Sequence, residues 1–268
     1  MSNLIIVSFL IFIVAVTMTM VGKGGGNFYV VILAMANIPM HEAATTGQFI
    51  LFSASVAAMI IFQKNKSVSW MLVILIGTFT ALSAFLGGYF SHLFSSFSLK
   101  LIFAFMLLIA GIVMLIPVSE NKANAKNKHF GIINIKSGDE IYNINLWIAL
   151  PITILTGFAS GMVGVSGGSF LVPLMVLACG VSMYTAVGTA STLIAATAFM
   201  GFIGHAMQGD FSPSYAIPLA IITIIGGIMG GKFSLKSKPK HLKKLFAYTN
   251  WMAALFMIFN AFYTKGII

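Results

Sequence analysis

Two glycine-rich segments interrupt apolar sequence at equivalent places in the two halves of this chain. The first, Gly22–Gly26, contains Lys23, and the second is Gly164–Gly168. Glycines permit sharp turns and let backbone N–H groups approach a ligand closely. A polar residue follows each segment, Asn27 or Ser169, as expected for the N-cap of a helix. We therefore predict that each segment breaks a helix and opens a short new one.

The start of a helix carries partial positive charge and free backbone N–H groups, so it attracts anions. Lys23 adds a formal charge beside the first break, and a charge at membrane depth indicates function because it is costly. We predict a small anionic substrate at the two breaks. The alternatives are that the glycines only allow close helix packing and that Lys23 reaches to the membrane interface. The predicted binding residues are Lys23, Gly24, Gly25, Gly26, Asn27, Ser166, Gly167, Gly168 and Ser169.

Further polar residues lie on the apolar segments that follow each break. Thr46 and Gln48 follow the first, and Thr189 and Ser191 follow the second. Their hydroxyl and amide groups are suited to complete the hydrogen-bond shell of an anion. The alternative is that each hydroxyl bonds to the backbone of its own helix, as is common in membrane helices.

Four titratable residues are expected at the outer ends of helices: His41, Glu42, His205 and Asp210. Histidine titrates near neutral pH, and a partly buried carboxyl can be shifted toward it. These residues are therefore candidates for coupling proton movement to transport. Simple solvation at the membrane interface is the alternative.

The elements that position these residues must lie in lipid. Of the 268 residues, 59% are hydrophobic and only 7% are charged, which excludes the soluble classes. Long apolar segments predict an all-α polytopic membrane protein. Two shorter apolar pieces, 27–37 and 169–179, either cross or re-enter as broken helices. The long segments are 3–22, 43–62, 69–91, 99–117, 145–163, 183–204, 213–231 and 245–263.

The chain is internally duplicated. At an offset of 142 residues, 20–30 aligns with 162–172 at seven identical positions of eleven. Each copy has five crossings if its short piece crosses and three if it re-enters, and both numbers are odd. The second copy is then upside down relative to the first, so we predict two inverted-topology repeats, 1–117 and 145–268, joined by a linker at 118–144. The glycine pairs Gly87–Gly88, Gly226–Gly227 and Gly230–Gly231 are expected to allow close helix packing.

Lysines in the loops predict the orientation in the membrane. Twelve fall on one predicted side and two on the other, which places the 118–144 linker in the cytoplasm and both termini outside. The net charge of +10 therefore reflects orientation and indicates no nucleic-acid partner. The single cysteine, Cys179, allows no intrachain disulfide and no cysteine metal cluster. The sequence indicates neither a cofactor nor a metal site, and it leaves a homo-oligomer open.

The paired glycine breaks, Pro173 after the second break, the Gly188–Ser191 stretch and the duplication resemble the sulfite exporter TauE/SafE family, also called the toluene sulfonate uptake permeases. The resemblance covers essentially the whole chain. It implies a transporter of sulfite, sulfonates, sulfoacetate or thiosulfate in a bacterial plasma membrane, coupled to an ion gradient. Two positions depart from the repeat pattern: Ser166 replaces the middle glycine of the second break, and Val31 stands where Pro173 predicts proline.

Two other classes of function are compatible with parts of the sequence. A passive anion channel would use the same helix-end chemistry. An intramembrane serine protease would use Ser166 of the Gly164–Gly167 stretch as nucleophile and His205 as base. The first repeat has glycine at the position of Ser166, so the repeats share glycine and not a nucleophile. This favours a transporter over an enzyme.

Overall fold

A computed structural model describes residues 2–93, 95–116, 131–137, 140–163, 167–209 and 211–264. Long helices dominate the described residues, and the predicted all-α architecture is confirmed. The elements in chain order are α1 (Ser2–Met20), α2 (Gly26–Met35), α3 (Met40–Lys64), α4 (Trp70–Tyr89), η1 (Ser91–Leu93), α5 (Ser96–Leu115), β1 (Ile132–Ser137), β2 (Glu140–Asn145), α6 (Leu146–Val163), α7 (Gly168–Pro173), η2 (Leu174–Ala178), α8 (Met183–Ala206), α9 (Pro213–Lys236) and α10 (Pro239–Thr264).

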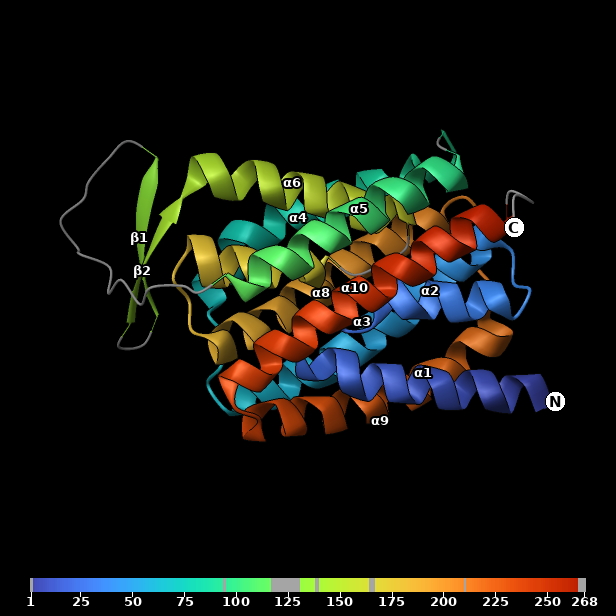
Figure 1. The fold of residues 1–268 in the computed structure, drawn as a ribbon, viewed down its shortest axis with the longest axis horizontal. Coiled ribbons are helices and arrows are strands. Elements are labelled where there is room, and N and C mark those ends of the chain that lie inside the picture. The colour runs from blue at the N-terminus through green and yellow to red at the C-terminus, as the bar shows by residue number, and fades with distance from the viewer. Residues whose placement is uncertain are drawn as a thin grey trace.

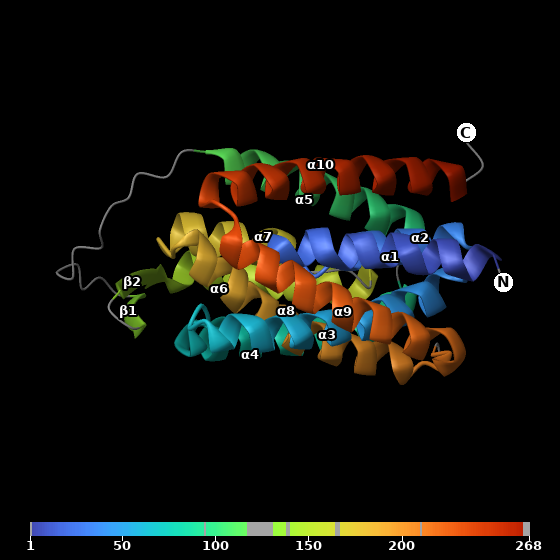
Figure 2. The same cartoon turned by 90° about the horizontal axis from the view of Figure 1, so that it is seen from below.

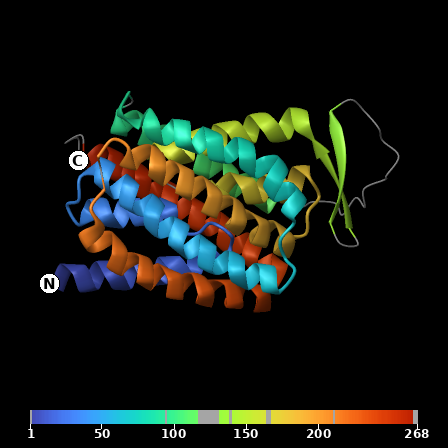
Figure 3. The same ribbon diagram turned by 180° about the vertical axis from the view of Figure 1, so that it is seen from behind.

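The long helices form an elongated bundle (Figure 1). The start of α1 and the end of α10 lie at one end of the bundle, and the β1–β2 hairpin lies at the other, as Figure 3 shows from behind. Figure 2 shows α5 and α10 side by side along one flank of the bundle. The predicted placement of both termini on one side and the linker on the other agrees with this arrangement.

Six helices in the described part of the chain are long and apolar enough to cross a membrane: α3, α4, α6, α8, α9 and α10. Large apolar side chains also cover much of the outer surface, among them Ile5, Trp147 and Leu255. Exposed apolar surface of this extent is unfavourable in water and favourable in lipid. The chain is therefore a multi-pass membrane protein.

Both short helices re-enter the bundle and do not cross it. α2 has 10 residues, about 15 Å at the rise of an α-helix and about half of a hydrocarbon core. It returns to the end where α1 begins, and α3 starts there (Figure 1). α7 and η2 likewise return to the hairpin end, where α8 starts. Within the bundle, each short helix therefore returns to the end from which the preceding long helix starts, as the arm of a re-entrant hairpin does.

Pro173 accounts for a difference between the two short helices. α7 ends at Pro173, and the chain continues as the π-helical turn η2. Proline has no N–H to donate to the preceding turn, so the regular α-helical bonding is interrupted there. Val31 occupies the corresponding position in the first half, and α2 remains α-helical through it.

The helices contact one another in a pattern that repeats after five α-helices. α4 packs on α6 and α8, while α9 packs on α1 and α3. α3 also packs on α8, and α5 packs on α10. Exchanging α1–α5 with α6–α10 reproduces these main pairs.

Glycine pairs permit several of these contacts. A side chain at Gly87 would overlap the α6 backbone at Phe158, and one at Gly88 would overlap the α8 backbone at Gly201. In the second half, a side chain at Gly230 would overlap the α1 backbone at Val16. The predicted packing role of these glycine pairs is confirmed.

A β-hairpin lies in the predicted linker and was not predicted. β1 and β2 pair antiparallel, with Ile133 opposite Ile144 and Ile135 opposite Tyr142. Tyr142 and Ile144 alternate along β2 and are buried in one cluster with Met114. Because alternate residues of a strand face one side, the hairpin packs one face on the end of the bundle. Residues 117–130 and 138–139 of the linker lie outside the described part.

Candidate functional site

The first glycine break is a tight turn between α1 and α2. Gly22, Gly24 and Gly25 have φ angles of 74°, 68° and 98°, a region that residues with a side chain rarely occupy. Gly25 is the N-cap of α2, and its carbonyl accepts from the N–H groups of Phe28 and Tyr29. The turn therefore requires glycine for its backbone shape.

The predicted N-caps are wrong in both breaks. α2 begins at Gly26 with Gly25 as N-cap, and Asn27 lies inside the first turn. α7 begins at Gly168 with Gly167 as N-cap, and Ser169 lies buried inside the first turn. In each break, the N-cap is a glycine that lies two residues before the predicted polar residue. The side chain of Asn27 lies outside the described part of the structure.

The second break is described from Gly167 onward; Gly164, Val165 and Ser166 lie outside the described residues. Gly167 has a φ of −69° and a ψ of −14°, which any residue can adopt. A side-chain carbon at Gly168 would lie 2.5 Å from the Gly22 carbonyl oxygen and 3.1 Å from the Lys23 Cα. Gly168 thus allows the second break to lie directly against the first.

The two breaks meet between α3 and α8. A side-chain carbon at Gly24 would lie 2.5 Å from Leu51 Cδ1 on α3 and 3.4 Å from Ile194 Cγ2 on α8. One at Gly22 would lie 2.9 Å from Val187 Cα on α8. The predicted approach of the two tips inside the bundle is therefore what the described residues show.

Lys23 is buried, with 2% of its surface exposed. Its Nζ donates to the Phe246 carbonyl oxygen at 3.1 Å and to Thr249 Oγ1 at 2.8 Å, both on α10. Nζ also lies 4.4 Å from the centre of the Phe246 ring. Lys23 therefore does not extend to the membrane interface. A third N–H remains on a charged ammonium for a further acceptor.

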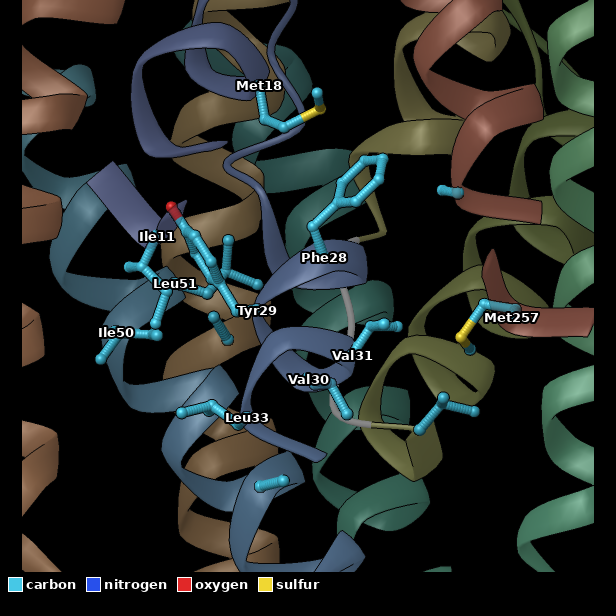
Figure 4. Packing of buried hydrophobic residues seen from close by; sticks show 14 of the residues in the cluster. Ile11, Met18, Phe28, Tyr29, Val30, Val31, Leu33, Ile50, Leu51 and Met257 are labelled. Atoms are coloured by element: carbon cyan, nitrogen blue, oxygen red, sulfur yellow. The ribbon is translucent and has the colours of Figure 1, made fainter. Parts of the chain in front are cut away.

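Two buried hydroxyls beside the first break have no hydrogen-bond partner: Ser55 Oγ and Tyr29 Oη. A side-chain carbon at Gly24 would lie 2.9 Å from Ser55 Oγ, and one at Gly25 would lie 2.8 Å from Tyr29 Oη. Figure 4 shows the Tyr29 ring directed from α2 toward Ile11 and Leu51. A buried polar group without a partner calls for a ligand or water.

Gln48 connects α3 to the second break. Its Nε2 donates to the Ser160 carbonyl oxygen on α6 at 3.0 Å, and its Oε1 is buried without a partner. Thr46 Oγ1, near the start of α3, is also buried without a partner. Thr46 and Glu42 flank the Tyr215 hydroxyl on α9. Gln48 therefore lies between α6 and α8, in contact with Ser160 and Gly201, whereas Thr46 belongs to a separate polar group with Glu42 and Tyr215.

The hydroxyls predicted on α8 are engaged within the protein. Thr189 Oγ1 accepts from the Ser69 N–H at 3.0 Å. Ser191 Oγ donates to the Val187 carbonyl oxygen at 3.0 Å, four residues earlier on its own helix. Ser191 therefore makes the bond to its own helix that the alternative predicts, whereas Thr189 accepts from the segment that precedes α4.

Three of the titratable residues predicted at the outer ends are described, and each lies in the first or last turn of a helix: His41, Glu42 and His205. His41 and Glu42 are in the first turn of α3 and are partly buried. His205 is fully buried at the end of α8; its Nε2 lies 2.8 Å from the Gly161 carbonyl oxygen and its Nδ1 lies 3.4 Å from Ser91 Oγ. Because a carbonyl can only accept, Nε2 carries the hydrogen. Asp210 lies outside the described residues.

Aromatic rings fill the space between α3 and α8 on the side of the breaks toward the chain termini. The rings of Phe49, Phe202 and Phe211 lie within 5.3 Å of one another, centre to centre. Phe52 and Phe199 form a further pair at 5.2 Å.

The described residues include six helices long and apolar enough to cross a membrane, and two short helices, α2 and α7, that follow glycine tips meeting inside the bundle. Together these features define a class, the multi-pass membrane transporters with broken helices. Comparison with known families agrees. Residues 7–257 match the family model of the sulfite exporter TauE/SafE. The chain belongs to the TauE/SafE family and is a membrane transporter.

Curated relatives are similar along most of their length. The chain is 27% identical over 238 residues to the "Probable membrane transporter protein YunE" of Bacillus subtilis, covering 83% of this chain and 85% of YunE. It is 27% identical over 263 residues to a "Probable membrane transporter protein" of Methanocaldococcus jannaschii, covering 92% of each chain. No solved structure matches the chain.

Two residues beside the breaks, Tyr29 and Ser55, were missed by sequence reasoning. Ser55 follows Gln48 by seven residues, two turns of one helix, so it lies on the same face of α3. That spacing is a signal that the sequence contained. Tyr29 gives no comparable signal, because an aromatic residue in an apolar helix is ordinary core material.

Proposed function

We propose that this chain is a secondary transporter that moves small sulfur-containing anions across the plasma membrane. The substrate class is sulfite, sulfonates, sulfoacetate or thiosulfate, in keeping with the name of the family that the chain matches. The observation that carries the proposal is the contact of the two glycine breaks, beside a buried lysine and partnerless hydroxyls.

The anion lies where the two breaks meet. Backbone N–H groups at the start of α2 and of the α7–η2 helix face this region, and helix starts stabilise negative charge. Ser55, Tyr29 and Gln48 surround it with buried polar atoms that lack protein partners. Lys23 adds Coulombic attraction in an interior of low dielectric, where a charge acts over longer distances than in water.

Alternating access follows from two equivalent halves. The repeated helix pairs support the division into 1–117 and 145–268 with a linker between them, and the opposite starting ends of α1 and α6 support the inverted relation. Two inverted halves can exchange conformations around a fixed central site and so open it to one side at a time.

The orientation places the lysine-rich loops and the β-hairpin in the cytoplasm and both termini outside. The termini and the hairpin lie at opposite ends of the bundle, as this orientation requires. A cysteine at Ser2, tested with a membrane-impermeant thiol reagent, should react from outside the cell. Reaction only from the cytoplasmic side contradicts the orientation.

The protease alternative has little support. Within the described residues, the Nε2–H of His205 is bonded to the Gly161 carbonyl and Nδ1 lies beside the Ser91 hydroxyl, so both ring nitrogens have contacts; Ser166 lies outside the described residues. The curated relatives described above are named as transporters.

Purified protein in liposomes tests the proposal. Labelled sulfite, sulfoacetate, thiosulfate, sulfate and lactate are supplied with and without an imposed proton gradient. Accumulation of a sulfur anion above its external concentration, only when the gradient is present, is the expected result. Equilibration without accumulation indicates a passive channel, and transport of lactate alone contradicts the proposed substrate class.

A further inference from the structure

Lys23 has a hydrogen-bond environment that suits both of its protonation states. Both partners of Nζ, the Phe246 carbonyl oxygen and Thr249 Oγ1, act as acceptors. Thr249 Oγ1 has its own hydrogen directed to the backbone of α10, 2.7 Å from the Leu245 carbonyl oxygen. A neutral amine satisfies both acceptors with its two hydrogens and keeps a lone pair, while an ammonium has one further hydrogen to donate.

No carboxylate in the described part of the chain pairs with Lys23, whose Nζ donates to a carbonyl and a hydroxyl. The elements packed against it are α10, α2 and α7. The titratable side chains that these elements carry are Tyr29 on α2 and, on α10, Lys240, His241, Lys243, Lys244, Tyr248 and Tyr263. Tyr248 is 58% exposed and faces away, and α7 contains no titratable residue.

A buried amide without a partner lies on the same helix as the partners of Lys23. Asn250 is fully buried, and neither its Nδ2 nor its Oδ1 has a hydrogen-bond partner. The Phe246 carbonyl that Lys23 contacts is also the helical acceptor for the Asn250 N–H, because an α-helix bonds residue i to i−4. The Asn250 side chain is therefore attached about one helical turn after Phe246, whose carbonyl oxygen accepts from Lys23.

A lone ammonium at this depth is costly, and a neighbouring anion reduces that cost. Protonation of Lys23 and binding of an anion therefore favour each other, since each supplies the charge that the other lacks. By thermodynamic linkage, the effect is reciprocal: the anion draws a proton onto Nζ, and departure of the anion releases it.

We infer that Lys23 is the proton carrier of this transporter: its Nζ lone pair takes up a proton as the anion enters, and the two cross together. This inference rests on the proposed anion transport and names its coupling residue. It differs from the expectation that His41, Glu42, His205 or Asp210 carries the proton. The anion and the proton then share one site, and no separate proton path is needed.

Proton uptake on binding tests the inference directly. Thiosulfate is the probe because it carries no proton that titrates near neutral pH. Its binding to the purified protein is measured calorimetrically in buffers with different heats of ionisation, from neutral to mildly alkaline pH. The expected result is uptake of up to about one proton for each anion bound. Lys23→Arg, which stays charged throughout, should bind the anion with no proton uptake.

The outcomes distinguish failure of the coupling role of Lys23 from failure of the proposed anion transport. Binding by the parent protein without proton uptake at any pH overturns the coupling role alone, whatever the variant does. Proton uptake that persists in Lys23→Arg also overturns it and returns the role to the histidines or carboxylates. Absence of binding by any sulfur anion overturns the proposed function itself. Lys66→Gln, in the loop after α3, serves as a control and should match the parent.

Discussion

The two glycine breaks align in sequence, yet each depends on glycine for a different physical reason. Gly22, Gly24 and Gly25 have positive φ angles, so the first break needs glycine for its backbone conformation. Gly167 has an ordinary helical conformation, and Gly168 is needed because the Gly22 carbonyl leaves no room for a side chain. Duplicated glycine motifs can therefore serve different purposes: one copy forms the tight turn, and the other allows its backbone to lie directly against the first copy.

Charge differs between the breaks as well. The first holds Lys23, bonded to α10, whereas the aligned residue of the second is Val165. A site built from two equivalent tips is therefore electrostatically one-sided. In the proposed mechanism, the first tip attracts the anion and carries its proton, and the second tip shapes the contact.

The largest effect is expected at the contact itself. Gly168→Val should abolish anion uptake and lower the free energy of unfolding by about 1–3 kcal/mol, the range for overpacking. The atoms it would meet, Gly22 O and Lys23 Cα, are backbone and cannot rotate away. Uptake and thermal unfolding measure the two effects.

Gly167→Ala is the matched control. Its nearest neighbour would be the Thr156 methyl group at 3.2 Å, a side chain that can shift. The expected change in stability is below about 0.5 kcal/mol. Equal losses at Gly167 and Gly168 would show that the breaks are not specialised as described.

The next effect concerns the charge. Lys23→Gln should weaken anion binding by about 1–3 kcal/mol, the range for a hydrogen bond to a charged group. Glutamine keeps most of the length and a donor, so it separates charge from position. Arginine should restore binding only in part, because its planar fork differs from an ammonium. Binding as tight as that of the parent in Lys23→Gln would leave the anion to backbone N–H groups alone.

The third-largest effect is expected on stability, at Gly25, where φ is positive. Gly25→Ala is expected to lower the stability by about 1–2 kcal/mol, the cost of a left-handed conformation for an ordinary residue. Gly25→Asn should cost less, because asparagine tolerates that region. The same two substitutions at Gly167 should show no advantage for asparagine. Equal unfolding temperatures for Gly25→Ala and Gly25→Asn would mean that packing against Tyr29, and not φ, limits this position.

The smallest effect is expected at a hydroxyl. Ser55→Ala removes a buried group without a partner, so stability should stay unchanged or rise slightly, while anion affinity should fall by about 0.5–1.5 kcal/mol, the net value of one hydrogen bond. Ser53→Ala is the control, because Ser53 Oγ is bonded to the Phe49 carbonyl on its own helix. Affinity that is unaffected by Ser55→Ala would remove this hydroxyl from the site.

Much of the fold could be predicted from sequence because lipid imposes a length on each crossing. Every long apolar segment forms a helix, and the short pieces form the re-entrant helices α2 and α7–η2. The β-hairpin was missed, since Ile132–Ser137 and Glu140–Asn145 lie in a polar region whose alternation is short. The N-caps were misassigned because the positive φ of Gly25 has no signature apart from glycine itself.

The candidate site was only partly predictable. The glycine breaks and their meeting followed from the duplication, which relates residues 142 positions apart. The partners of Lys23 did not, because Phe246 is 223 residues away and lies on the last helix. Asn250 escaped notice for a similar reason: an asparagine without a partner is recognised only once its neighbours are placed.

We propose that an anion binds where the two breaks meet. Calorimetric titration of the purified parent protein with thiosulfate and with dimethyl sulfone, a neutral compound of similar size, tests it most directly. The account predicts one thiosulfate bound per chain, no measurable binding of the sulfone, and loss of thiosulfate binding in Gly168→Val. Equal binding of both compounds, or thiosulfate binding unchanged in a folded Gly168→Val protein, would contradict it.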